Sequence, residues 1–456
     1  MTATDVEGTA TDGIFEPLRF RHLTVKNRVF RSSVGGRLDY YDGSGSDARI
    51  NWELKFARGG VGAIISSFCP VTIRGRIVPG FATIDRDERI PFWRELADRV
   101  HEHGCKFILQ LSHSGRQQDI IGIEYNRSLS PTSKPESIHG LRADRMTIAQ
   151  IKETVRAFAD GARRARAAGL DGVETHSAHG YLISQFLSSA INDRKDEYGG
   201  SLENRARFLL EIVEAIRAEV GPDFHLQAKI SATEHNNALF PWEKKGNTLE
   251  ESIQVCRWLE QAGVDALHVS AGSSFPHPHI PAGDFPVADA SRVYGGMLSS
   301  GAYTLRNLLI FRTPGLNQLW RRWWRRSGPE HPEGAILSDA RAIKDAVDIP
   351  VLCTGGFQTA SVIRSAIERG DCDGVTIARP LVANNDLVNL FAQGHDRAPR
   401  PCTYCNRCLV NVIMHPIGCY EERRYETREE MVRQILSVFD RDVPPTNGDS
   451  RRAGGG

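Results

Sequence analysis

The sequence lacks several patterns that would place it in a particular class of protein. It has no run of about 18 apolar residues, so it predicts no transmembrane helix. Its first residues include no apolar core typical of a secretory signal, and we therefore expect a cytoplasmic protein. The formal net charge of +1 provides no excess positive charge for binding nucleic acid. No G-x-G-x-x-G motif opens a helix after a strand, which argues against a dinucleotide-binding doubly wound sheet.

Short apolar segments alternate with helical patterns along most of the chain. The strand candidates are 27–33, 62–68, 106–112, 172–177, 225–231, 266–272, 350–356 and 374–380. Continuous apolar runs are typical of parallel strands covered on both faces. Helical periodicity follows over 147–169, with Thr147 as N-cap, and again over 202–221 and 338–348. These units predict an α/β protein with a single TIM (β/α)8 barrel, and a doubly wound sheet is the alternative.

The spacing of these units also predicts the domain boundaries. We expect a flexible N-terminus at 1–13, the barrel at 14–400, a cysteine-bearing extension at 401–440 and a disordered tail at 441–456. The gap between the sixth and seventh strands is the longest, which predicts an insertion at about 285–335 in the loop that follows the sixth strand. Because β-to-α loops open onto the active-site face of a barrel, the insertion should lie on that face.

The insertion contains an unusual segment, 305–328, that is rich in tryptophan and arginine. At helical spacing Trp320 and Trp324 share one face, beside a face with Leu319 and Trp323. Three roles are open. In the first, the segment would form a lid over the barrel mouth. In the second, it would bind a second copy of the chain or an electron-transfer partner. In the third, it would bind a membrane surface.

Glycines and polar side chains cluster where the predicted strands end, which is the edge at which barrels build their sites. Gly355 and Gly356 would let backbone N–H groups approach a phosphate, and Arg379 would add a bidentate charge. Gln110 can pair with the edge of a heterocycle, and Lys229 supplies a positive charge. Together these residues predict a phosphorylated ring cofactor across the barrel mouth.

Several stretches at the strand ends carry recognisable motifs. They are HSAHGYLISQFLSSAINDRKDEYGGSLENRARFLLEIVEAI (176–216), LQLSHSGRQ (109–117), CTGGF (353–357) and IARPL (377–381). These stretches resemble the Old Yellow Enzyme superfamily of FMN-dependent barrels, also described as NADH:flavin oxidoreductases. The resemblance covers 14–400 and implies FMN as cofactor, with NAD(P)H as electron donor.

The resemblance implies a role for each residue at these positions. The residues that would bind FMN are Ser33, Val34, Gly35, Gln110, Lys229, Gly355, Gly356, Ala378 and Arg379. His176 and His179 would hydrogen-bond the carbonyl oxygen of a substrate, where negative charge builds as hydride reaches Cβ. Tyr181 would then donate a proton to Cα from the opposite face.

The end of the first strand departs from the pattern of the superfamily. Gly35 stands where relatives carry a side chain against the flavin, and Lys229 stands where arginine is commoner. Arg37 lies just beyond this strand end. It would either contact an acidic group of the substrate or form a surface ion pair with Asp39 or Asp42.

Four cysteines, Cys402, Cys405, Cys408 and Cys419, follow the barrel. Without a secretory signal, such a cluster favours a metal centre over disulfides, and four thiolates suit a 4Fe–4S cluster or zinc. Their position resembles the iron–sulfur branch of the superfamily, which includes 2,4-dienoyl-CoA reductase and trimethylamine dehydrogenase. That likeness implies a 4Fe–4S cluster, which would be auxiliary or would exchange electrons with a separate protein.

These features predict an FMN-dependent oxidoreductase with a small-molecule substrate. The expected reaction is the NAD(P)H-driven reduction of an activated C=C bond in an α,β-unsaturated carbonyl or enoyl thioester. The alternatives are an oxidative amine demethylase or dehydrogenase and a non-catalytic electron carrier. His176 and His179 favour a carbonyl oxygen, because a cationic amine would require an aromatic cage.

Overall fold

The computed structural model describes residues 12–118, 125, 127–236, 244–273, 277–298 and 301–440. The flexible N-terminus predicted at 1–13 lies outside these residues except for its last two positions, and the tail predicted at 441–456 lies entirely outside them. Within the described ranges, no helix combines the length and the apolar character needed to cross a bilayer.

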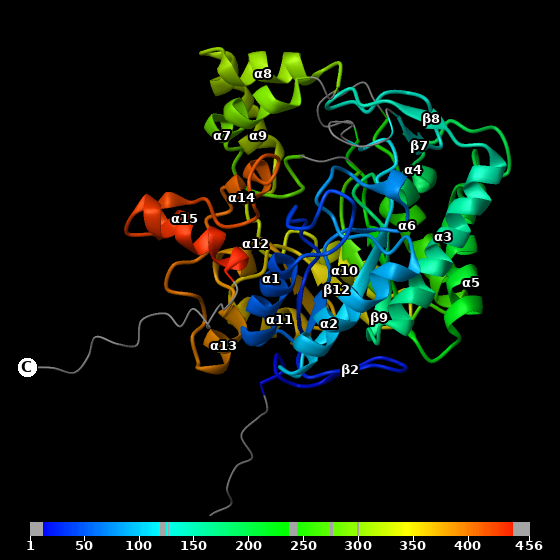
Figure 1. Ribbon diagram of the computed structural model, residues 1–456, viewed down its shortest axis with the longest axis horizontal. Coiled ribbons are helices and arrows are strands. Elements are labelled where there is room, and N and C mark those ends of the chain that lie inside the picture. The colour runs from blue at the N-terminus through cyan, green and yellow to red at the C-terminus, as the bar shows by residue number, and fades with distance from the viewer. Residues whose placement is uncertain are drawn as a thin grey trace, which may run out of the picture.

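A closed parallel barrel forms the centre of the molecule (Figure 1). Its strands are β3 (Val29–Arg31), β4 (Ala63–Ile65), β6 (Lys106–Ser112), β9 (Gly172–Ser177), β10 (His225–Ser231), β11 (Ala266–Ser270), β12 (Val351–Thr354) and β13 (Gly374–Ile377). β13 pairs with β3 and β4 pairs with β6, which closes the circle. A short strand, β5 (Cys69–Pro70), adds to the end of β6. All eight predicted strands are present, and the prediction of a TIM barrel is confirmed.

Helices surround the barrel. They are α1 (Asp47–Arg58), α2 (Ile90–His101), α3 (Ile148–Ala167), α5 (Leu202–Val220), α6 (Leu249–Gln261), α10 (Leu337–Lys344), α11 (Ala360–Glu368), α12 (Arg379–Ala383) and α13 (Leu387–Ala392). Three of them, α3, α5 and α10, lie where the periodicity predicts. α3 begins where the sequence predicts, because Thr147 and Gln150 form a capping box. Thr248 and Glu251 start α6 in the same way.

The N-terminal end of the barrel is closed by a small hairpin. Its strands are β1 (Leu18–Arg19) and β2 (Thr24–Val25), which lie at the bottom of Figure 1. Leu18, Phe20 and Leu23 of the hairpin are buried against residues inside the barrel, including Phe30 and Leu352. Because this end is filled with apolar side chains, a cavity can open only at the C-terminal ends of the strands.

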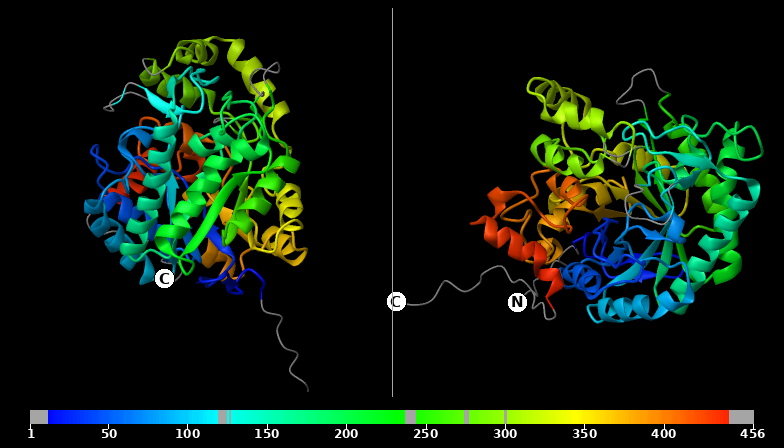
Figure 2. Two further views of the ribbon diagram at one scale, coloured as in Figure 1. Left: turned by 90° about the vertical axis from the view of Figure 1, so that its right-hand side faces the viewer. Right: turned by 45° about the horizontal axis from the view of Figure 1, so that its top comes forward.

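The insertion and the C-terminal extension lie together on the other end. The insertion contains α7 (Val287–Val293), a 3-10 turn η3 (Tyr294–Met297), α8 (Thr304–Arg312) and α9 (Leu316–Ser327), and the extension contains α14 (Arg407–Asn411) and α15 (Arg428–Leu436). Phe285, Phe311 and Trp324 form a separate apolar cluster in the insertion, and Val410 and Ile413 of the extension pack against it. In Figure 2 the yellow-green helices of the insertion lie at the top of the molecule in both views.

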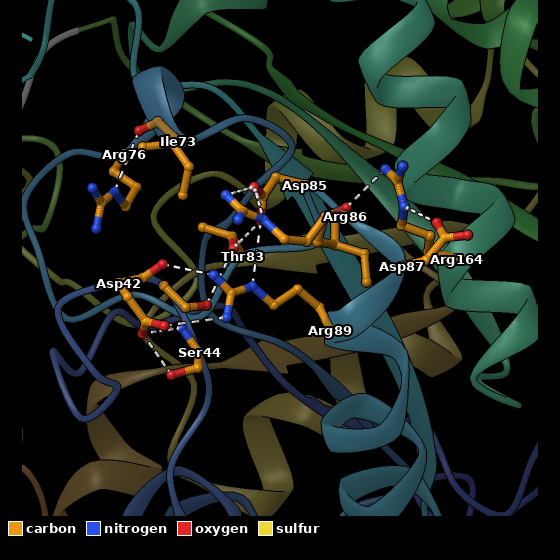
Figure 3. A network of polar contacts seen from close by, with 12 residues as sticks. Asp42, Ser44, Ile73, Arg76, Thr83, Asp85, Arg86, Asp87, Arg89 and Arg164 are labelled. Atoms are coloured by element: carbon orange, nitrogen blue, oxygen red, sulfur yellow. Dashed lines mark hydrogen bonds and ion pairs between the residues drawn. The ribbon is translucent and has the colours of Figure 1, made fainter. Parts of the chain in front are cut away.

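A network of polar contacts fixes the loops that follow β3 and β5 (Figure 3). Arg89 donates to the carbonyl oxygen of Asp42 at 2.6 Å and lies 3.4 Å from the carboxylate of Asp85. Asp87 accepts from Arg164 of α3 at 2.7 Å. The network therefore ties the segment after β3, which carries Arg37, to the neighbouring helices.

Candidate active site

A cavity of about 410 Å³ opens at the C-terminal ends of the strands. The predicted cofactor and substrate residues all line it, namely Ser33, Val34, Gly35, Arg37, Gln110, His176, His179, Tyr181, Lys229, Gly355, Gly356, Ala378 and Arg379. These residues come from six different strand ends. The barrel closure therefore brings together side chains that lie far apart in the sequence.

His176, His179 and Tyr181 form a cluster at the end of β9. His176 belongs to the strand itself, His179 has left-handed backbone with a φ of 59°, and Tyr181 directly precedes α4 (Leu182–Leu187). The ring centroids of His176 and His179 are 5.4 Å apart in an edge-to-face arrangement. The centroids of His176 and Tyr181 are 4.8 Å apart. Two imidazoles and a phenol thus meet at one place in the cavity.

The hydrogen bonds of the two histidines differ. Nε2 of His179 lies 2.7 Å from Oγ of Ser270, which fixes the ring. Nδ1 of His176 is buried and has no hydrogen-bond partner among the described residues. Burial is the main cause that lowers the pKa of both imidazoles well below their usual value, and the charge of Lys229 acts in the same direction. Both rings are therefore neutral at pH 7, and His176 retains a ring nitrogen for a ligand.

Gln110 and Lys229 are held in place by hydrogen bonds, in positions where they could bind the ring of a flavin. Oε1 of Gln110 accepts from Ser33 at 2.7 Å, and its Nε2 donates to the buried carboxylate of Glu174 at 2.7 Å. Each end of the amide keeps one further hydrogen-bonding position. Nζ of Lys229 is buried and lies 3.5 Å from Oγ of Ser32, at the limit of a hydrogen bond. These underused donors fit a heterocycle with acceptor atoms, so the site fits the FMN that the resemblance implies.

Burial lowers the pKa of Lys229 to about 8 from 10.5, although Glu174 acts in the opposite direction. The folded apoprotein therefore pays a cost for the charged amine at pH 7, which shrinks as the pH rises from about 8 towards 10.5. The size of the shift corresponds to about 3 kcal/mol. We expect Lys229→Met to raise the unfolding free energy of flavin-free protein by up to that amount at pH 7, and by little near pH 10.

Urea denaturation of flavin-free protein at both pH values measures this effect, and Lys229→Arg is the control because it keeps the charge. If Lys229→Met instead destabilises the flavin-free protein equally at pH 7 and pH 10, the lysine side chain stabilises the fold by packing alone. FMN affinity is measured in parallel, and we expect Lys229→Met to weaken it.

Gly355, Gly356 and Arg379 lie where a phosphate is predicted. A Cβ on Gly356, whose φ is 68°, would come within 2.7 Å of the carbonyl oxygen of Pro332, so this position requires glycine. The guanidinium of Arg379 is buried and donates to the carbonyl oxygen of Ala282 at 2.6 Å and to the side chain of Asn406. The predicted phosphate residues are thus also tied to the insertion and to the C-terminal extension.

The four clustered cysteines lie beside this end of the cavity as free thiols. Burial raises the pKa of Cys402 and Cys408, and Arg379 acts in the opposite direction. Negative charge on Cys402, Cys405 or Cys419 acts in the same direction as burial and raises the pKa of Cys408. Across the described part of the chain, however, no group of three or more His, Cys, Asp or Glu side chains is arranged to hold a metal ion.

Arg37 lines the cavity and donates to the carbonyl oxygen of Ile413 in the extension. The two carboxylates that the sequence offers as surface partners have other contacts. Asp39 is buried and lies 3.4 Å from Arg49, and Asp42 lies 3.6 Å from Arg89. Arg37 thus lies at the wall of the cavity, in contact with the extension.

Some cavity residues escape prediction from the sequence. The ring of Phe81 lies 2.9 Å from where a Cβ on Gly35 would stand, so Phe81 takes the space that a side chain at this strand end would use. Nε2 of His139 lies 3.0 Å from the hydroxyl of Tyr294, and its Nδ1 lies 3.4 Å from Glu136. These residues come from loops, and no local pattern marks them.

Trp324 of the insertion also lines the cavity. It is 1% exposed, and its Nε1 donates to the carbonyl oxygen of Gly283 at 2.9 Å. α9 is helical as predicted, and Trp320 and Trp324 share the face that packs on the apolar cluster. This geometry supports the lid role for the inner face of the segment.

The chain is similar to several known proteins. The pattern of the NADH:flavin oxidoreductase / NADH oxidase family matches residues 13–288. The NADH oxidase of Thermoanaerobacter brockii is 32% identical over 424 residues, which are 90% of this chain and 57% of that protein. The 4,4'-dithiodibutanoate disulfide reductase of Rhodococcus erythropolis is 30% identical over 410 residues, 88% of this chain and 93% of that protein.

A solved structure of 2-naphthoyl-CoA reductase with 2-naphthoyl-CoA superposes with a TM-score of 0.72 and 25% identity. The match covers 90% of this chain and 56% of that one. The chain thus spans little more than half the length of the NADH oxidase and of the naphthoyl-CoA reductase.

Proposed function

Because the chain belongs to the NADH:flavin oxidoreductase / NADH oxidase family, we propose that it reduces an activated C=C bond conjugated to a carbonyl group, with FMN as cofactor and NAD(P)H as donor. The observation that carries the proposal is the cluster of two neutral imidazoles and a phenol in the cavity. Neutral donors suit an oxygen on which negative charge develops.

Different residues of the site would bind the cofactor, bind the substrate and donate the proton. Gln110, Lys229 and the glycines after β12 would hold FMN, which supplies hydride when bound. His176 and His179 would hold the carbonyl oxygen of the substrate and stabilise its developing negative charge. Tyr181 would donate the proton to Cα, and the buried setting that raises its pKa to about 12 keeps its hydroxyl protonated.

One anaerobic experiment separates this proposal from the alternatives. Photoreduced protein is mixed with cyclohexenone, and the flavin absorbance is followed. Rapid reoxidation with formation of cyclohexanone supports ene-reduction. An electron carrier would not reoxidise, and an amine dehydrogenase would instead bleach from the oxidised state on addition of trimethylamine. Either of these results would contradict the proposal.

We further propose that Cys402, Cys405, Cys408 and Cys419 hold a 4Fe–4S cluster. Four free cysteines within one short segment support this, as does the positive charge beside them, since Arg424 donates to Sγ of Cys419 at 3.1 Å. Anaerobically purified protein should contain about four iron and four sulfide ions. Zinc in place of iron, or neither metal, would contradict this assignment.

Arg37 supplies a prediction about the substrate. If its guanidinium meets a carboxylate or phosphate of the substrate, Arg37→Ala should raise KM for an acidic enone by about 10- to 100-fold, the usual effect of losing a charged hydrogen bond. The KM for cyclohexenone should stay nearly unchanged. Steady-state kinetics with both substrates measures the difference, and an equal rise for both would show that Arg37 only shapes the cavity.

A further inference from the structure

α8 and α9 present a surface that the chemistry of the cavity does not use. Its leucines are Leu305 and Leu309 on α8 and Leu316 and Leu319 on α9, with exposures of 55%, 54%, 46% and 65%. The spacings of four and three residues place each pair on one side of its helix. With the exposed arginines Arg312, Arg322 and Arg326, we name these residues the leucine–arginine surface.

The opposite sides of these helices are firmly packed. Leu308 and Phe311 of α8 are buried in the apolar cluster of the insertion with Trp324 of α9. The ring centroids of Phe311 and Trp320 are 5.7 Å apart. Each helix therefore packs one apolar side into the protein and exposes a second apolar side, which carries the leucines, to solvent. Scattered exposed leucines are ordinary, but these four lie on two helices that pack against each other.

The charge of the segment points to the kind of partner. Residues 305–328 contain six arginines and no acidic residue, in a chain whose formal net charge is only +1. Asp284 lies 2.9 Å from Arg325 and 3.7 Å from Arg321, so it partly neutralises one side of α9. Arg322 and Arg326 lie on the same helix and are exposed. A partner that matches this surface must be both anionic and apolar.

We propose that the leucine–arginine surface binds the anionic phospholipid surface of a membrane. The leucines would enter the boundary between headgroups and acyl chains, and the arginines would pair with phosphate groups. Figure 1 shows α8 at the top of the molecule, with α9 below it, and the barrel further down. Trp324, on the inner side of α9, lines the cavity, so bound protein would present that cavity close to apolar compounds dissolved in the membrane.

Co-sedimentation of the full chain with vesicles tests the proposal. We expect binding to vesicles of phosphatidylcholine with phosphatidylglycerol and little binding to phosphatidylcholine alone. Binding should weaken as the salt rises from about 0.1 M to 1 M, because the screening length falls from about 10 Å to 3 Å. Leu309→Glu/Leu319→Glu and Arg322→Glu/Arg326→Glu should each lower the affinity at least about tenfold.

The matched control lies on α15, where Leu436 is 44% exposed and Arg433 is also exposed. Leu436→Glu/Arg433→Glu should bind vesicles like the unmodified protein. All variants should reduce cyclohexenone in solution at unchanged rates, which shows that they fold. The proposal is wrong if the unmodified protein does not bind anionic vesicles, or if the α15 variant loses as much binding as the α8 and α9 variants. It is also wrong if light scattering shows a dimer that the Leu309→Glu/Leu319→Glu variant dissociates.

Discussion

Tyr181→Phe is expected to slow the reoxidation of reduced protein by cyclohexenone by about 10²- to 10⁴-fold, the usual effect of losing a general acid. Reduction of the flavin by NAD(P)H should hardly change, because that step needs no proton on carbon. Burial holds the pKa of Tyr181 at about 12, so the unmodified protein should keep its reoxidation rate from neutral pH to above pH 9. Stopped-flow absorbance of the two half-reactions measures both effects.

Tyr294→Phe is the matched control, because Tyr294 is a second buried tyrosine in the same cavity and its hydroxyl contacts His139. It should leave both half-reactions within a few-fold of normal. If Tyr181→Phe slows both half-reactions equally, or if Tyr294→Phe has the same effect, then Tyr181 is not the proton donor.

The largest effect on ligand binding is expected at the two histidines. Phenols resemble an enolate, so they should bind where His176 and His179 converge. His176→Ala and His179→Ala should each weaken phenol binding about 10- to 100-fold, because each removes a hydrogen bond to a charged oxygen in a buried place. Burial keeps both rings neutral between pH 8 and pH 6. The affinity for phenols should therefore not rise over this range, because neither histidine becomes protonated.

Flavin absorbance titrations with a phenol measure these affinities. His139→Ala provides the control, since His139 lines the same cavity but is engaged by Tyr294 and Glu136. Unchanged phenol affinity in both His176→Ala and His179→Ala would overturn the role in binding the oxyanion. Equal losses in all three variants would show a general effect on the shape of the cavity.

The barrel could be predicted because its signals are local and repeated. Several strands are continuous apolar runs, as at Ala63–Ile65, and helical patterns alternate with the strands along the chain. Caps such as the Thr147 box mark helix starts directly in the sequence. The hairpin at Leu18–Val25 had no such signal, because its strands are two residues each and depend on the barrel end that they cover.

The site could be predicted where it depends on strand ends and not where it depends on loops. His176 and Lys229 lie within strands, so their register fixes where they stand. Phe81 and His139 lie in loops, and their positions follow from contacts with distant segments. The cysteine spacing indicated the chemistry of the extension, but the sequence could not show that its sulfur atoms lie beside Arg379.

The connection between the cysteine segment and the loop after β12 has an evolutionary consequence. The hydroxyl of Tyr404 donates to the carbonyl oxygen of Gly356 at 2.6 Å, Gln358 exchanges hydrogen bonds with the backbone of Cys402, and Asn406 accepts from Arg379. Loss of the segment would remove the partners of Gly356, Gln358 and Arg379, which costs free energy at each of these groups that stays buried. Among homologues, we expect the identities of residues 358, 404 and 406 to covary with the presence of the cysteines, so that the barrel and its extension are inherited as one unit.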